Sequence, residues 1–161
     1  MTILAIDPGT EKSGYVVIKD GNPKPVESGV IPNGQLLNMV SEIEPEIVLC
    51  EWIESYGMSV GKSVFETCHF IGRLYLTSIY YQVHDFHHIG RKAIKMHHCN
   101  SMRAKDANIR QALIDKYGKP GNKKAQGTTY GISSHAWSAY AIAMYYVETG
   151  GNIEVAYEPN F

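Results

Sequence analysis

Two acidic residues stand at the ends of short apolar runs that are typical of buried strands. Asp7 ends the run TILAID, and Glu51 ends the run EIVLCE. A carboxylate within a buried sheet costs several kcal/mol unless it is paired or bound to a metal ion. Asp7 alone could simply cap the turn at Pro8-Gly9. Two acids at equivalent strand ends, with no Lys or Arg on either strand to pair with, favour a site for Mg²⁺ or Mn²⁺.

Three further candidate ligands lie in the second half of the chain. His135 and Ser138 are one turn apart at the start of the last expected helix, so they share a face. Asp106 lies in the first turn of the preceding helix. Each position has an ordinary alternative, because a first-turn histidine is often a surface or capping residue and a first-turn acid often interacts with the helix dipole. With an unperturbed pKa of about 6.5, His135 could also accept a proton near neutral pH.

The net charge of −1 conceals a strongly basic segment. Residues 91–124 contain ten of the fifteen Lys and Arg residues and only two acids, so this segment carries about +8 and the rest about −9. Histidine, asparagine and serine alternate with these cations, which suits contact with phosphates. A solvated face is the alternative, but we expect a nucleic-acid surface on an otherwise acidic protein. The candidate contacts in this segment are Arg91, Lys92, Lys95, Arg103, Lys105, Arg110, Lys123 and Lys124.

The hydrophobic pattern predicts the elements that position these residues. We expect strands at residues 2–7, 14–19, 26–31, 46–51 and 82–86. We expect helices at residues 33–43, 63–82 and 102–117, and from Ser133 or Ser134 to Val147. In the helix at 63–82, the spacing predicts a buried stripe of Val64, Cys68, Ile71, Tyr75 and Ile79. This order predicts an α/β fold with a mixed five-stranded sheet and helices on both faces, whose parallel strands end at a common crevice.

Length and composition are those of one soluble globular domain. With 161 residues, 44% hydrophobic and 19% charged, we expect a single domain at residues 1–150 and a peripheral tail at 151–161. No apolar run approaches the roughly 20 residues of a membrane span, and no export signal is visible. We therefore expect a cytoplasmic protein without a membrane partner. The three well-separated cysteines, Cys50, Cys68 and Cys99, predict free thiols.

Four blocks of the chain resemble RuvC-type Holliday junction resolvases, and more narrowly the short resolvase-like nucleases of bacteriophages and prophages. They are LAIDPGTEKSGYVVI, VLCEWIESYGMSVGKSVFETCHFIGRL, RAKDANIRQALIDKYG and SSHAWSAYAIAMYY, in family order over residues 2–147. The resemblance implies a ribonuclease H-like nuclease domain that forms a homodimer and cleaves four-way DNA junctions with the help of metal ions. If the chain is phage-encoded, its compartment is the cytoplasm of the bacterial host.

By motif, the resemblance implies that Asp7, Glu51 and His135 are the catalytic residues and ligands of two Mg²⁺ or Mn²⁺ ions. The chain departs from the family at Ser138, where bacterial members commonly carry a second acid. Either His135, water and Asp106 complete the ligand set, or catalysis is weakened. No small-molecule cofactor is implied.

The loop from Trp52 to Lys62 corresponds to the family segment that reaches the centre of the junction. Tyr56 and Met58 could wedge against unpaired bases there, with Lys62 beside them on the phosphates. The alternative is a loop that is held in place by its own aromatic side chain.

Two other functions stay open. The motif DPGT also resembles the first phosphate loop of the actin and sugar-kinase fold, although that architecture needs two domains and a second glycine-rich loop. A junction-binding protein without nuclease activity is the other alternative, because Ser138 replaces an acid.

Overall fold

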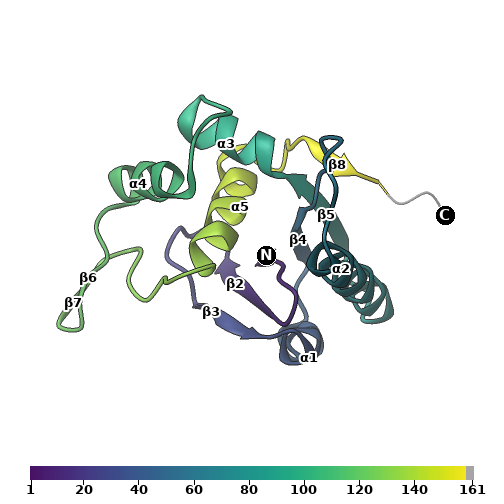
Figure 1. Cartoon of the computed structure of the whole chain (residues 1–161). Helices are drawn as coiled ribbons and strands as arrows, with labels where there is room; N and C mark the ends of the chain where they lie inside the picture. The colour runs from purple at the N-terminus through teal and green to yellow at the C-terminus, as the bar shows by residue number, and fades with distance from the viewer. Residues whose placement is uncertain (159–161) are drawn as a thin grey trace.

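The computed structural model describes residues 1–158 and contains a six-stranded mixed sheet in the order β3-β2-β1-β4-β5-β8 (Figure 1). The strands of this sheet are β1 (Thr2–Asp7), β2 (Lys12–Lys19), β3 (Glu27–Pro32), β4 (Ile47–Trp52), β5 (Asp85–Gly90) and β8 (Val155–Tyr157). β1 is parallel to β4, and β4 to β5, whereas β2, β3 and β8 add antiparallel neighbours. The predicted mixed α/β sheet is confirmed.

Helices cover both faces of the sheet, as predicted (Figure 1). Within residues 1–158 they are α1 (Asn33–Ile43), α2 (Lys62–Tyr80), α3 (Arg91–Cys99), α4 (Asp106–Tyr117) and α5 (Ala136–Glu148). α1 and α2 pack on one face, and α5 packs on the other, where α3 and α4 lie against it. None of the helices in the described part of the chain is long and apolar enough to cross a membrane.

The two central parallel strands are apolar on both sides, because successive side chains of a strand point to opposite faces. The side chains of β1 and β4 in the α5-side core are Ile3, Ala5, Ile47 and Leu49. Those in the α2-side core are Leu4, Ile6, Val48 and Cys50. Asp7 and Glu51 continue the first of these series. The alternation therefore directs both acids to the face that α5 covers.

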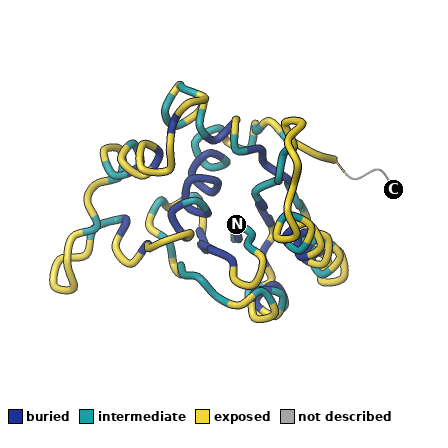
Figure 2. Tube along the Cα trace, viewed as in Figure 1, coloured by how far each residue is buried: buried dark blue, intermediate teal, exposed yellow. Residues whose placement is uncertain are grey.

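α5 is the most deeply buried helix of the molecule (Figure 2). Every residue from Ala136 to Tyr145 except Ser138 is buried. Four alanines on this helix have at most 1% of their surface exposed, which lets the helix backbone approach the sheet closely. The start of α5 is consequently held in a fixed position beside the ends of β1 and β2.

The sixth strand of the sheet comes from the segment predicted as a peripheral tail, of which residues 159–161 lie outside the described part. β8 pairs antiparallel with β5, and Tyr157 stacks on Trp52 at the end of β4 with ring centroids 4.5 Å apart. This aromatic contact joins residues far apart in sequence, so local pattern could not show it. The tail protects one edge of the sheet.

The predicted buried stripe of α2 is wrong at two of its positions. Cys68 is exposed and Ile79 is 51% exposed, whereas the buried residues are Thr67, Phe70, Ile71, Leu74 and Ser78. α2 carries apolar residues around much of its circumference, so helical spacing alone did not determine which side meets the sheet. The helix consequently leaves a second apolar face exposed.

The basic segment is more ordered than predicted. α3 was not expected, because it is rich in Lys, Arg and His and buries only Ala93 and Ile94. β5 occupies residues 85–90 instead of 82–86. The basic loop after α4 contains a small hairpin of β6 (Gly121–Asn122) and β7 (Ala125–Gln126).

Candidate active site

Asp7 and Glu51 lie next to each other at the carboxyl ends of parallel strands. The register of β1 and β4 pairs Ile6 with Cys50, so the next residue on each strand is the acid. Their side chains are only 16% and 12% exposed. Burial raises the pKa of both carboxyls, and the Asp7 charge raises that of Glu51 further. Two buried carboxylates in this position need cationic partners.

His135 is the first of these partners. It stands at the N-terminal end of α5, and its Nδ1 lies 3.0 Å from Oδ2 of Asp7. This contact lowers the pKa of Asp7 and so offsets part of the effect of burial. The imidazole is 71% exposed, so the ring contacts the buried Asp7 carboxylate on one side and solvent on the other.

Gly14 is what allows the start of α5 to reach Asp7. It is the β2 residue paired with Asp7 across the sheet, and a Cβ atom at Gly14 would lie 2.8 Å from Cβ of His135. Any side chain at this position would therefore push the helix away from the strand end. The sequence signal, a glycine inside an apolar strand, is typical of such a close approach.

The turn that follows Asp7 is held by Asn33, a residue that sequence analysis did not associate with the site. Nδ2 of Asn33 donates to the carbonyl oxygens of Gly9 and Thr10 at 2.9 and 3.1 Å. Oδ1 of Asn33 accepts from Ser13 Oγ at 2.7 Å. These bonds fix the loop beside the carboxylate. An asparagine just before a predicted helix indicates a cap, and nothing local in the sequence indicates this longer-range role.

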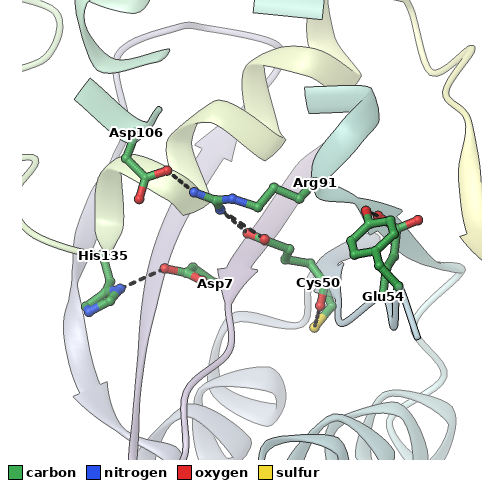
Figure 3. A network of polar contacts seen from close by, with 8 residues as sticks. Asp7, Cys50, Glu54, Arg91, Asp106 and His135 are labelled. Atoms are coloured by element: carbon green, nitrogen blue, oxygen red, sulfur yellow. Dashed lines mark hydrogen bonds and ion pairs between the residues drawn. The ribbon is translucent and has the colours of Figure 1, made fainter. Parts of the chain in front are cut away.

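Arg91 is the second cationic partner, and it comes from the start of α3, because neither strand carries a Lys or Arg (Figure 3). Its Nη1 donates to Oε1 and Oε2 of Glu51 at 3.0 and 3.3 Å, and its Nη2 donates to Asp106. The guanidinium lowers the pKa of Glu51 against the effect of burial. Arg91, predicted as a DNA contact, therefore joins two of the predicted metal ligands.

A cleft of about 620 Å³ brings most of the candidate ligands together. Glu51, Asp106, His135 and Ser138 line it, as does Arg91. The Ser138 hydroxyl also contributes to lowering the pKa of Asp7. The apolar part of the wall is formed by Ile94, Ala107, Ile109, Ile114, Trp137 and Ala141.

Several of the predicted DNA contacts line this cleft or the one next to it. A second cleft of about 390 Å³ shares Glu51 and Arg91 with the first and is lined by Lys92, Lys95 and Tyr56. The guanidinium of Arg110 lies in the first cleft, 4.9 Å from the centre of the Trp137 ring. The other basic residues that were predicted as DNA contacts are all exposed: Lys62, Arg103, Lys105, Lys123 and Lys124.

The loop after β4 presents its apolar side chains to solvent. Tyr56 is 73% exposed and Met58 is 79% exposed. The hydroxyl of Tyr56 donates to Glu54 at 2.9 Å, but its ring is not packed into the protein. This arrangement does not support the alternative in which Tyr56 holds the loop in place.

The donor set at the strand ends fits a hard divalent cation. Carboxylate oxygens of Asp7, Glu51 and Asp106 with one imidazole are ligands that Mg²⁺ and Mn²⁺ accept. Asp7 and Glu51 are also buried enough to favour a counter-ion. Their present partners are His135 and Arg91.

A second group of residues has tighter metal-ligand spacing and lies at the opposite ends of the helices. Within residues 1–158, His97, His98 and Glu148 are the one group of three such residues whose ligand atoms all lie within 4.8 Å of one another. Lys116 Nζ already lies 2.6 Å from Oε2 of Glu148 and supplies the positive charge there. We therefore assign this cluster a structural role.

Comparison with solved structures identifies the fold. Neither a protein-family model nor a curated protein sequence matches the chain. The structure of Thermus thermophilus RuvC in complex with a Holliday junction substrate aligns with a TM-score of 0.68 and 17% identity, over 94% of this chain and 97% of that chain. A second Thermus thermophilus RuvC structure aligns with a TM-score of 0.66 and 16% identity, over 94% and 98%. The chain has the ribonuclease H-like fold of RuvC.

Proposed function

We propose that this protein is a metal-dependent endonuclease that cleaves branched DNA, four-way junctions above all, by phosphodiester hydrolysis that leaves 5′-phosphate ends. The observation that carries the proposal is the placement of Asp7 and Glu51 side by side at parallel strand ends, with His135 and Asp106 beside them. The fold similarity to RuvC, including a structure that contains a Holliday junction, supports it. Membership of the phage branch stays a prediction.

The residues at the strand ends have distinct tasks in this proposal. Two Mg²⁺ or Mn²⁺ ions bound to these oxygens would activate the attacking water and stabilise the leaving oxygen. Asp7 would be the shared ligand, and Glu51 and His135 would be the outer ones. Asp106 and Ser138 would complete the set directly or through water.

His135 also has the geometry of a proton acceptor. Its Nδ1 is engaged by Asp7, and the ring is largely exposed. The carboxylate fixes the orientation of the imidazole, and the second nitrogen is free to take a proton from water.

The basic residues and the exposed loop would bind the DNA around this centre. Arg103, Lys105 and Arg110 would hold phosphates on the α4 side, and Lys92 and Lys95 on the α3 side. The exposed Tyr56 and Met58 at the tip of the loop after β4 suit stacking against unpaired bases at a branch point. Contacts of this kind would select structure more than sequence.

Paired cuts across a symmetric junction require two active sites, and we propose that a homodimer provides them. The exposed apolar face of α2 supports this proposal. Leu76, Ile79 and Tyr80 on this face are 62%, 51% and 77% exposed, and they border a groove with Leu37 of α1. An apolar surface of this kind is expected to be covered by another protein surface.

Cleavage of synthetic four-way, three-way and linear DNA in Mg²⁺ or Mn²⁺ tests the proposal, with Asp7→Asn as the matched inactive variant. We expect nicking of branched DNA by the wild type and at least a hundredfold loss in Asp7→Asn, while junction binding is retained. Cleavage that Asp7→Asn leaves unchanged would refute the metal site. Equal cleavage of linear duplex would refute junction selectivity, and junction binding without any nick would favour the non-catalytic alternative.

A further inference from the structure

Arg91 occupies a position that a phosphate-binding residue alone would not need. It is the first residue of α3, and its guanidinium contacts two predicted metal ligands from different elements, Glu51 of β4 and Asp106 of α4 (Figure 3). No other Lys or Arg in residues 1–158 makes an ion pair with either acid. The planar fork of arginine suits such a bridge between two carboxylates.

The bridge and a divalent cation require the same oxygen atoms. Both oxygens of Glu51 accept from Nη1 of Arg91, at 3.0 and 3.3 Å. A cation bound there would lie within a few ångströms of the guanidinium, in a partly buried site where like charges repel strongly. The guanidinium and the cation therefore cannot hold Glu51 at the same time in this arrangement.

Arg91 has space into which it can move. Its side chain is 34% exposed and lines both the 620 Å³ cleft and the 390 Å³ cleft. Lys92 and Lys95 line the second cleft, so this is the region in which DNA phosphates would lie.

We propose that Arg91 and the divalent cation exchange on the carboxylates: binding of the cation releases the guanidinium from Glu51 and Asp106, and the released side chain binds a DNA phosphate. The inference rests on the proposed function for the identity of the cation and the DNA. It makes Arg91 a positioning residue that keeps the acids together until the site is loaded. It also couples loading of the site to binding of the substrate.

Calorimetric titration of Mn²⁺ into EDTA-treated, dialysed protein without DNA tests the exchange. Arg91→Gln should bind Mn²⁺ about tenfold more tightly than the wild type, because one competing unit charge is removed. Arg91→Lys, which keeps the charge but cannot bridge both acids, should be intermediate. Arg110→Gln is the matched control, since it removes an arginine from the same cleft that does not contact the acids, and should change the affinity less than twofold.

Unchanged or weaker Mn²⁺ binding by Arg91→Gln would overturn the exchange and show that Arg91 instead orients the ligands. If the variants do not fold, NMR of the wild type decides. The guanidinium Nε–H resonance of Arg91 should move during a Mg²⁺ titration, and a resonance that stays in place at saturation would overturn the proposal.

These results are separable from the fate of the proposed function. Tighter Mn²⁺ binding by Arg91→Gln in a protein that cuts no branched DNA would support the exchange and refute the nuclease. Junction cleavage by the wild type together with unchanged binding by Arg91→Gln would refute the exchange alone.

Discussion

Glu148 offers the sharpest test of how the active-site helices are held. It is the last residue of α5, and its carboxylate accepts from Lys116 Nζ at 2.6 Å, from His97 Nε2 at 2.8 Å and from the hydroxyl of Tyr117. The C-terminal ends of α3, α4 and α5 therefore meet at one carboxylate. The N-terminal ends of the same three helices meet at the active site, so Glu148 stabilises the arrangement that positions the acids.

The stability that Glu148 contributes follows from its pKa. Burial alone would raise this pKa, but the hydrogen bonds from Lys116, Tyr117 and His97 outweigh it and lower the pKa to about 2, from an ordinary value of 4.5. A difference of this size corresponds to roughly 3 kcal/mol of stability. Solvent reaches part of the cluster, so we expect Glu148→Gln to lose about 2 kcal/mol at pH 7.

The sign of the pH dependence is fixed by the lowered pKa. The contribution of Glu148 is fully present above the unfolded-state value near 4.5, and it is lost as the pH falls toward about 2. Urea unfolding of wild type and Glu148→Gln between pH 7 and pH 2.5 measures it, with the exposed Glu154→Gln as control. The difference in unfolding free energy between wild type and Glu148→Gln should become smaller as the pH falls below 4.5. A stability difference between wild type and Glu148→Gln below about 0.5 kcal/mol at pH 7, or a difference that does not change with pH, would contradict this prediction.

Three further predictions concern the strand ends and the loop. Gly14→Ala should lower the folding stability by about 1–3 kcal/mol and the rate of junction cleavage at least tenfold, because the new methyl group displaces His135. The control Gly72→Ala, in open space on α2, should leave thermal stability unchanged or raise it. Asp7→Asn should raise the melting temperature of EDTA-treated protein at pH 8, because burial raises the pKa of Asp7 and makes its charge unfavourable in the folded state. This gain in melting temperature should disappear at pH 3, where the carboxyl is protonated. A lower melting temperature of Asp7→Asn at pH 8 would contradict the prediction. Tyr56→Ala should change stability by less than about 0.5 kcal/mol while lowering the preference for junction over duplex in binding assays.

Much of the fold could be predicted because its signals are local. The apolar runs that end at Asp7 and Glu51 indicate strands buried on both faces, and their alternation, counted back from each acid, directs the two carboxylates to one side. The prediction was wrong where apolar residues surround a helix, as in α2, and where a short helix such as α3 buries few residues.

The candidate site could be predicted as a list of residues but not as a set of contacts. The residue pattern predicts that two acids end buried strands, that a histidine lies at the start of the last helix and that the cations gather in one segment. The packing of the sheet and helices was needed to show that Gly14 lets His135 reach Asp7 and that Arg91 bridges Glu51 and Asp106. The physical reason is that strand ends and side-chain alternation depend on neighbours in the chain. Ion pairs between residues 40 and 128 positions apart depend on how the sheet and helices pack.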